Sequence, residues 1–508
     1  MKAKRLLCIL ALVGSAFGLL RAQGRNVCFE AGTPGGNASS AEIYSGIEKG
    51  GFRPGYSSSN YWRAGAAAKT RGLFGKSFMT GSFSFEELHG KDMMTSMFIN
   101  PGYYPIDVLE FTPGDKTLQT YRFSGGIVHF VTERWRLGGK LDFSSQNYAK
   151  RKDIRHTNYA LDLTVAPSAL YVGKNYVLGF SGIFRKTSES IEAEQVGAAT
   201  ADTYYAFFDK GMRYGTYQAW DGSGIHLAEA GVSRLPVREF SYGAAVQFSV
   251  GDLYMDAEYL RTDGLVGERG YDWYRFPGHR MAANLSWQHY PLLFYNLYNF
   301  GRLTLHADWR GQRLEEAAWD KVTSGGITLP EVYGYNTVYR RRQTNLSADY
   351  EFLFLYSALR SVKLGYSGTV WDEHASPQYP YTDRWHLWMS RLELTAVTGL
   401  PFGGIGKRFT LTFGARGFWA HDSEQGLEAG EAAVEPAAAP FRLSGDWIRK
   451  HEYMTSSGMG LNGSLAYAFH AVRGLSLSVD ASWTHAFEIE YLLGKNRWTG
   501  NLHLGYAF

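Results

Sequence analysis

The sequence predicts an all-β fold, an integral outer-membrane antiparallel β-barrel with short periplasmic turns and long extracellular loops. Three observations predict it: a leader typical of exported proteins, long segments in which apolar and polar residues alternate, and a last segment that alternates up to a terminal phenylalanine. Alternation gives a strand one face for hydrocarbon and one for a wet lumen. We expect about 18 strands, with about 16 as the alternative, because such barrels usually have an even number.

The first residues have the order of a secretory signal peptide. Residues 1–5 are rich in basic side chains, residues 6–20 are apolar, and the small residue Ala22 follows. This order is typical of exported precursors. We therefore assign residues 1–22 to a signal peptide, with cleavage after Ala22 favoured over cleavage after Gly18.

Composition excludes several classes of protein. A net charge of +4 on 508 residues is close to neutral, which argues against a nucleic-acid binder. Beyond the leader no stretch of about 18 apolar residues occurs, so we expect no membrane-spanning helix. The aromatic share of 16%, with 59 glycines against 15 prolines, suits long strands. Cys28 is the one cysteine outside the leader, which excludes a disulfide framework or a cysteine metal site.

The sequence after the signal peptide indicates one domain. No Pro/Ser-rich linker or shift in composition divides it, and we assign residues 60–508 to the transmembrane β-barrel. Residues 23–59 form an N-terminal lead with three alternatives: a first strand near residues 41–52, a plug in the lumen, or a periplasmic extension.

Alternation with a period of two recurs along the chain. It is clearest in residues 136–144, 240–250, 302–310, 408–416, 459–469 and 475–484. Strands of soluble sandwiches are usually shorter and more charged on their outer face. Tryptophans stand at the ends of several segments, where a ring would lie at the level of the lipid headgroups. These are Trp309, Trp419, Trp483 and Trp498.

The lengths of the connections predict the orientation. Short turns are expected near residues 132–134, 173–175, 251–252, 400–404 and 470–474. Long loops are expected near residues 89–116, 187–237, 312–341 and 421–453. Outer-membrane barrels place short turns in the periplasm and long loops outside, so the long set is assigned to the cell surface.

The expected lumen face carries both signs of charge. In a channel such side chains can set ion selectivity, but we favour the alternative that they pair across strands and keep the interior wet. The near balance of signs argues against a strongly selective channel. The lumen candidates are Arg122, Lys140, Asp142, Asp162, Asp256, Glu258, Arg302, Asp308, Arg310, Asp349, Glu351, Lys363, Arg391, Glu393, Arg408 and Arg416, with Asp480 as a further acid.

Two loop features stand out. The loop at 187–237 is rich in aromatic residues, including Phe207, Phe208 and Trp220, and such rings need burial. We expect them to fold into the lumen as a constriction or plug, joined by the cluster at 271–276, although a partner- or sugar-binding patch is the alternative. The basic run at 340–342 could meet lipopolysaccharide phosphates, with a solvated rim as the favoured interpretation.

Catalytic motifs are missing from the sequence. No Gly-x-Ser-x-Gly elbow, phosphate-binding glycine loop, His-Glu-x-x-His helix or EF-hand loop occurs, and the 14 histidines are dispersed. We therefore expect no catalytic, cofactor-binding or metal-binding residues and no cofactor. An enzyme acting at the barrel rim through His306, His485 or Ser478 is the least favoured hypothesis.

The chain end and several short motifs carry a resemblance. Residues 498–508 alternate strictly, and Leu504, Tyr506 and Phe508 resemble the C-terminal insertion signal of outer-membrane barrels. Together with Tyr44-Ser-Gly46, Gly51-Phe-Arg-Pro54 and Gly81-Ser-Phe-Ser-Phe85, the chain resembles a family of uncharacterised Bacteroidetes-type outer-membrane β-barrel proteins. The resemblance implies no assigned activity. The sequence lacks the plug and TonB-box features of TonB-dependent transporters and is short for that class.

These observations favour a porin-like channel or small-solute transporter in the bacterial outer membrane. The alternative is a structural or accessory barrel that binds partner proteins in a secretion, assembly or surface machine. Expected partners are outer-membrane lipid and lipopolysaccharide, the barrel-assembly machinery, and proteins that meet the surface loops, with no nucleic acid.

Overall fold

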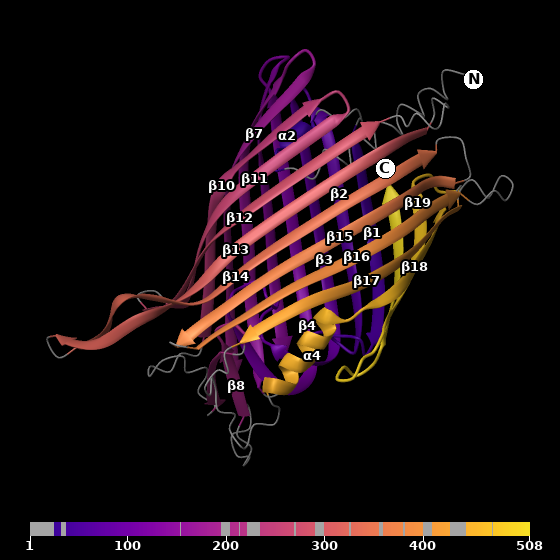
Figure 1. Ribbon diagram of the computed structural model, residues 1–508. Coiled ribbons are helices and arrows are strands. Elements are labelled where there is room, and N and C mark those ends of the chain that lie inside the picture. The colour runs from indigo at the N-terminus through magenta and orange to yellow at the C-terminus, as the bar shows by residue number, and fades with distance from the viewer. Residues whose placement is uncertain are drawn as a thin grey trace, which may run out of the picture.

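Figure 1 shows the computed structural model, a single large barrel of tilted strands. It describes residues 25–508 except 32–36, 153, 195–203, 213, 221–233, 269–270, 290–298, 325–326, 355–358, 379–380, 400–408, 427–442 and 470. The signal peptide expected at residues 1–22 and the lumen candidate Arg408 lie outside the described residues. No described helix is long and apolar enough to cross a membrane.

The strands form one closed antiparallel barrel of 18 strands, the number that the sequence predicts. Each strand pairs with the next along the chain, β7 pairs with β10, and β20 pairs with β1. The barrel strands are β1 (Ala38–Gly50), β2 (Asn60–Phe74), β3 (Ser77–Ser96), β4 (Asp107–Phe130), β5 (Trp135–Lys150), β6 (Arg155–Val172), β7 (Tyr176–Glu194), β10 (Arg234–Val250), β11 (Leu253–Glu268), β12 (Tyr271–His289), β13 (Asn299–Ser324), β14 (Ile327–Phe354), β15 (Leu359–Gln378), β16 (Tyr381–Gly399), β17 (Phe409–Gly426), β18 (Gly458–Ala468), β19 (Leu475–Ala486) and β20 (Asn496–Ala507).

Four shorter elements accompany the barrel. They are the helices α2 (Val27–Glu30) and α4 (Leu443–Thr455) and the strands β8 (Tyr204–Asp209) and β9 (Gly215–Trp220). In Figure 1, α2 lies toward the upper end of the barrel, whereas α4 and β8 lie at the lower end.

The first and last strands close the cylinder. The backbone N–H of Ser39 donates to the carbonyl of Phe508 at 3.0 Å, and the N–H of Phe508 donates back to Ser39 at 2.9 Å. The strand expected near residues 41–52 is β1, so the barrel begins at Ala38 and not at residue 60. Closure pairs the backbone groups of both terminal strands, which hydrocarbon could not satisfy.

The barrel exterior is an apolar belt between two rows of aromatic rings. The belt includes Ile43, Phe83, Phe123, Phe180, Phe413 and Leu461, all exposed on the outer surface. Exposed rings at one edge are Trp62, Trp388, Trp419 and Trp498, and those at the other edge, beside the short turns, are Phe74, Trp135, Tyr176 and Phe508. A closed barrel with this exterior is a bacterial outer-membrane barrel.

The short turns gather at one end, as predicted for the periplasmic side. Gly75 and Gly251 occupy two of them with φ of +59° and +54°, a region that residues with a Cβ rarely adopt. The predicted turn at 400–404 lies outside the described residues, as does residue 470 in the turn at 470–474.

At the opposite, extracellular end the strands are longer than the sequence predicts. β13 and β14 pair from Leu314 to Ser324 through most of the loop expected at 312–341, and they project as a hairpin beyond the barrel (Figure 1). The loops expected at 89–116 and 187–237 are likewise shortened by β3, β4, β7 and β10. Outside the membrane both strand faces meet water, so the alternation ends although the backbone pairing continues.

Candidate functional site

The helix α2 lies inside the lumen at the periplasmic end. Val27, Cys28 and Phe29 are almost fully buried. They pack against inward side chains of the barrel wall beside the short turns, namely Phe78, Val128, Leu170 and Tyr254. A plug in the lumen was one of the three placements expected for the N-terminal lead.

Glycines in the wall make room for this helix. A Cβ on Gly126 of β4 would lie 2.6 Å from Val27 Cγ2, and a Cβ on Gly179 of β7 would lie 2.6 Å from Phe29 Cε2. Real Cβ atoms do not approach other carbons so closely. Residues at these two positions therefore have to lack a side chain for α2 to dock.

Polar contacts hold the start of the plug. The Asn26 side-chain amide donates to the carbonyl of Ala169 at 3.0 Å and to Gln247 Oε1 at 3.1 Å. Arg25 forms ion pairs with Glu258 at 3.1 Å and with Asp142 at 3.8 Å. Two of the predicted lumen acids thus bind the N-terminal segment, a role that the sequence did not predict.

The connection at residues 97–106, between β3 and β4, crosses the lumen at the extracellular end. At its start the N–H of Ile99 donates to Glu189 of β7 at 2.9 Å. Further along, Arg341 of β14 donates to the carbonyls of Gly102 at 2.5 Å and Tyr103 at 2.9 Å. The connection therefore spans from one wall of the barrel to another, although no in-folding was predicted for it.

A hydrophobic core surrounds this connection. It includes Met97, Phe98, Tyr104, Phe208, Phe276 and Trp385, which come from the loop, the hairpin of β8 and β9, and the inner faces of the strands. β8 pairs with the first residues of β4, and the Phe208 ring stacks on Tyr274 at 5.3 Å. The buried side chains of this core fill part of the lumen at the extracellular end.

The predicted burial of the aromatic loop is confirmed where the structure describes it. Phe207 and Phe208 are 0% and 3% exposed. The Trp220 side chain is outside the described residues. The cluster at 271–276 joins the same core through Tyr274 and Phe276, but it belongs to strand β12 and not to a loop.

Most described lumen candidates are paired with a residue of opposite charge. Arg185 forms a bidentate pair with Asp162 at 2.7 and 3.0 Å, and Arg280 binds Asp308 at 2.6 Å. The other pairs that involve candidates are Lys140–Asp142, Arg280–Glu258, Arg302–Glu351, Arg310–Glu239, Lys363–Asp349, Arg391–Glu393 and His503–Asp480. Asp256 accepts from Asn284 at 2.8 Å, and Arg122 lies on the inward face of β4, between the exposed Tyr121 and Phe123.

Two adjoining cavities lie against the wall formed by β14 to β17, β19 and β20. The outer one has a volume of about 380 Å³ and the inner one about 200 Å³. They share Ser367 and Arg391, and the inner cavity is also lined by Asp349, Lys363 and Glu393. Polar side chains thus continue from the extracellular end toward the middle of the lumen.

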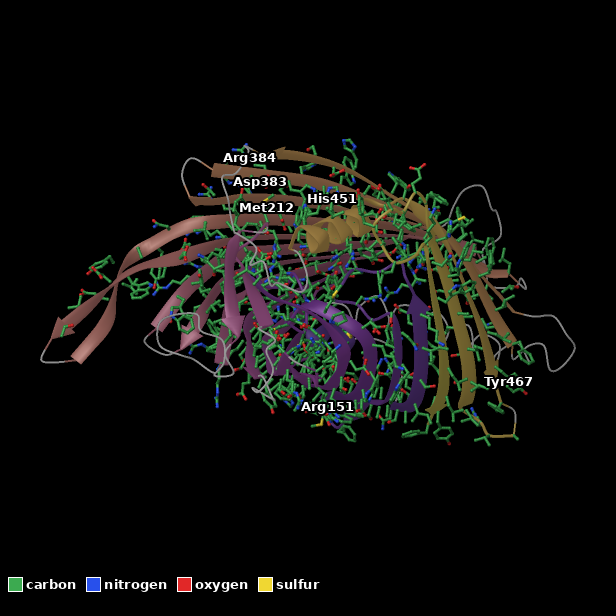
Figure 2. All side chains as sticks on the ribbon, turned by 90° about the horizontal axis from the view of Figure 1, so that it is seen from below. Arg151, Met212, Asp383, Arg384, His451 and Tyr467 are labelled. Carbon is green, nitrogen blue, oxygen red and sulfur yellow. The ribbon has the colours of Figure 1, made fainter. Side chains whose placement is uncertain are left out.

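Figure 2 shows α4, with its residue His451 labelled, at the open end of the barrel, and the helix contributes one side of the outer cavity. Its Tyr453 and Met454 line the cavity. His451 contacts Asp422 of β17 at 2.7 Å, and Glu452 accepts from three successive backbone N–H groups at residues 490–492, at 2.6 to 2.9 Å. These contacts fix α4 to β17 and to the connection between β19 and β20.

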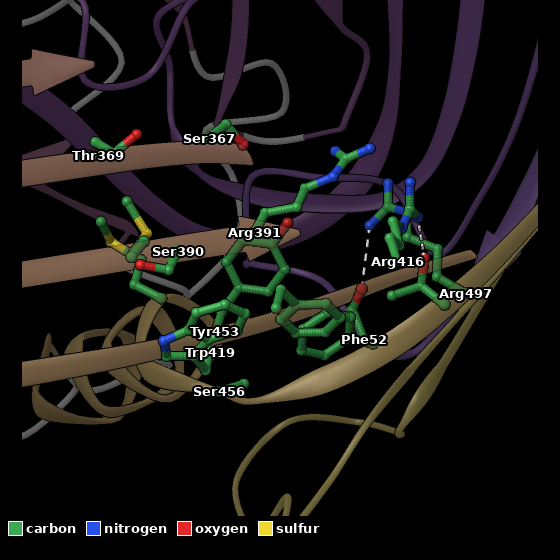
Figure 3. Close-up of a pocket in the computed structure, with 14 residues that line it drawn as sticks. Phe52, Ser367, Thr369, Ser390, Arg391, Arg416, Trp419, Tyr453, Ser456 and Arg497 are labelled. Atoms are coloured by element: carbon green, nitrogen blue, oxygen red, sulfur yellow. Dashed lines mark hydrogen bonds between the residues drawn. The ribbon is translucent and has the colours of Figure 1, made fainter. Parts of the chain in front are cut away.

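Three arginines converge in the outer cavity (Figure 3). Arg391 pairs with Glu393, and Arg497 pairs with Glu48 and also donates to the Phe52 carbonyl at 3.3 Å. Arg416 instead donates to the hydroxyl of Thr484. No carboxylate of the described residues lies within ion-pair distance of Arg416.

Sequence reasoning identified Arg391 and Arg416 but missed Arg497, Phe52 and Tyr453. Arg497 lies just before the alternating residues 498–508, Tyr453 lies on the helix α4, and Phe52 lies in a short connection, so no period of two marks them. Among the described residues no group of three or more His, Cys, Asp or Glu side chains is arranged to hold a metal. His306 and His485 contact the asparagines Asn284 and Asn496.

A family model of unknown function (DUF6850) matches residues 29–508. The chain belongs to this family. The match covers the last two residues of the plug helix and the whole barrel. No curated protein matches the chain.

Solved outer-membrane receptors have a distantly similar structure. The ferripyoverdine receptor of Pseudomonas aeruginosa is 10% identical, with 93% of this chain and 72% of that chain covered and a TM-score of 0.41. The iron transporter FrpB of Neisseria meningitidis is 10% identical, with 92% and 81% covered and a TM-score of 0.43. A likeness this distant assigns no function.

Proposed function

We propose that this protein is a porin-like channel or transporter that carries a small solute across the outer membrane. The support comes from how the lumen is filled. α2 packs on the walls formed by β4 to β7, β10 and β11, and the connection at 97–106 is held by β7 and β14. The polar cavities lie elsewhere on the wall, against β14 to β17, β19 and β20.

The arrangement of the obstructing segments is the observation that carries the proposal. Both are folded against part of the wall, and neither α2 nor residues 97–106 lines either cavity. Charged pairs and hydroxyls on the cavity side offer a solute successive hydrogen-bonding groups, as in pores with a polar lining. The proposal includes no catalytic step.

Conductance of the purified protein in planar lipid bilayers tests the proposal. We expect discrete channel openings in potassium chloride, and larger ones for a variant that lacks residues 25–31, because that variant has no plug helix. Barrel integrity is checked by the slower gel mobility of unheated protein. If intact barrels of both proteins show no conductance and no solute uptake into liposomes, the proposed function is wrong.

A second candidate function is an accessory barrel that binds partner proteins at the cell surface. The hairpin of β13 and β14 favours it, because Trp319, Val332 and Tyr333 are 41%, 40% and 64% exposed beyond the barrel. Exposed apolar side chains on a projecting element are typical of interaction sites. A partner that co-purifies in equal amount, and is lost when Trp319 and Tyr333 are replaced by Ser, would favour this function over passage.

A further inference from the structure

We propose that the outer cavity is a binding site for a small organic anion that carries a carboxylate on a flat apolar ring. The proposal rests on the proposed passage, since it names the class of solute that the passage would take. Three features of the cavity support it: an arginine that pairs with no carboxylate of the described residues, a neighbouring pair of arginines, and aromatic rings beside them.

The charge of the cavity favours an anion. Arg391 and Arg497 each have a glutamate partner, whereas Arg416 has none among the described residues. The three guanidinium groups gather at one side of the cavity (Figure 3). Counted over the residues that the structure describes, two of the three cations are neutralised, and the remaining single positive charge matches a monoanion.

Neighbouring residues position Arg416 to contact the carboxylate of a ligand. A Cβ on Gly460 of the neighbouring β18 would lie 2.5 Å from Arg416 Nε, so this glycine makes room for the arginine side chain. Among the described residues the guanidinium makes one hydrogen bond, to Thr484. A guanidinium has five N–H donors in a planar fork that fits a carboxylate with two parallel hydrogen bonds.

Aromatic side chains supply the apolar part of the site. The Phe52 ring lies 5.9 Å from Phe418 and 5.0 Å from Tyr453, measured between ring centres. All three residues line the cavity together with Met389 and Met454. A flat ring of the ligand can pack on such a surface while its carboxylate meets the arginines.

The size of the cavity limits the ligand. Binding sites for small molecules usually have volumes of about 300 to 1,000 Å³, and this cavity, at about 380 Å³, is at the small end. It fits a ligand with one ring. It also lies at the extracellular end, beside the connection that carries Phe52, where a solute would arrive first.

Calorimetric titration of the purified barrel in detergent tests the site. The probes are benzoate, its uncharged counterpart benzamide, and inorganic phosphate. We expect saturable binding of benzoate that weakens with added salt, and at least about tenfold weaker binding of benzamide and phosphate, a difference of about 1.4 kcal/mol. Equal affinity for benzoate and benzamide, or phosphate binding as tight as that of benzoate, would overturn the proposal.

Variants of single arginines test whether benzoate binds at Arg416. Arg416→Gln should weaken benzoate binding at least about tenfold, and Arg416→Lys should weaken it less, because lysine keeps the charge but not the fork. Arg122→Gln, which removes a lumen cation on β4, is the matched control and should change the affinity less than about twofold. Gel mobility of unheated protein confirms that each variant is folded. Unchanged benzoate affinity in folded Arg416→Gln would overturn the proposal.

The two proposals fail separately. Benzoate binding without conductance or uptake would leave the site in place and exclude the passage. Conductance without benzoate binding would leave the passage and exclude the site.

Discussion

Arg341 donates hydrogen bonds to the carbonyls of Gly102, Tyr103 and Tyr104, at 2.5, 2.9 and 3.5 Å, and to Gln312 at 2.8 Å. The residue is only 5% exposed. A single buried side chain thus fixes the far end of the connection at 97–106. The sequence showed Arg341 only as part of a basic run assigned to a solvated rim or to lipopolysaccharide, and this interpretation of Arg341 is wrong.

Replacing Arg341 by Met should release the connection. Each hydrogen bond to a charged group contributes about 1.5 to 3 kcal/mol, and the freed carbonyls would have to find water. We expect faster proteolysis within residues 97–106 and larger conductance in bilayers. Arg340→Met is the matched control, because Arg340 is exposed on the same strand. Equal protease resistance of Arg341→Met and the parent would contradict this role.

The buried Glu189 and the half-buried Asp107 predict that the same connection is sensitive to pH. Burial raises the pKa of Glu189 from its usual value of 4.5 to about 7, and burial raises the pKa of Asp107 from 3.8 to about 7. Glu189 accepts from Ile99, and Asp107 accepts from Ser96 at 2.7 Å. Asp107 directly follows the connection and Glu189 lies on β7 beside its start, both outside the apolar belt.

The raised pKa values determine whether a higher pH stabilises or destabilises the connection. An acid whose pKa is higher in the folded state stabilises that state fully below its unfolded pKa, and this stabilisation is lost as the pH rises through the folded value. We expect backbone amides at 97–106 to exchange hydrogen faster at pH 8 than at pH 5.5, after correction for intrinsic rates. Glu189→Gln should reduce that difference. The same corrected rates at both pH values would refute the prediction.

At the level of elements, the plug helix α2 depends on the shape of the wall beneath it. Gly126→Leu would place a side chain where Val27 now lies, 2.6 Å from the new Cβ. The helix should then leave the wall and expose Cys28, which is 0% exposed in the parent. We expect Cys28 of this variant to react with a maleimide reagent at least about tenfold faster than Cys28 of the parent, because the labelling rate depends on the fraction of molecules in which the helix has left the wall.

Gly139→Leu on the neighbouring strand is the matched control, because a Cβ there meets nothing within 4 Å. It should leave Cys28 labelling unchanged. If Cys28 is labelled equally slowly in folded Gly126→Leu and Gly139→Leu, the helix is not held by these wall glycines.

The strands also show where the alternation of apolar and polar residues stops predicting strand structure. In the apolar belt, strands such as β7 place Leu178, Phe180 and Phe184 outward on every second residue, and the sequence predicted such segments. Above the belt, β7 continues through Ser188 and Ser190 with polar residues on its outer face. Hydrocarbon imposes the alternation, so the predicted strands ended near the edge of the membrane.

At the scale of the whole molecule, closure joins β1 to β20. The predicted insertion signal lies at the end of β20, with Leu504 and Tyr506 on the strand and Phe508 directly after it. All three are exposed outward, and the rings of Tyr506 and Phe508 stack at 5.5 Å. Phe508→Ala keeps the backbone pairing with Ser39 but removes the terminal ring. We expect less barrel in the outer membrane, measured as heat-modifiable protein in that fraction, whereas Leu477→Ala on β19 should have little effect. Equal amounts of Phe508→Ala and parent barrel in that fraction would count against an insertion signal at Phe508.

The sequence by itself determined the strands, their inward and outward faces, the side that bears the short turns, and the paired charges of the wall. These properties repeat over a few residues, since each follows from which solvent a side chain meets. Tertiary structure decided what fills the lumen. Asn26 meets Gln247 across 221 positions, and Arg341 meets Tyr103 across 238. Contacts between segments so far apart depend on the closed cylinder, so no local pattern of residues encodes them.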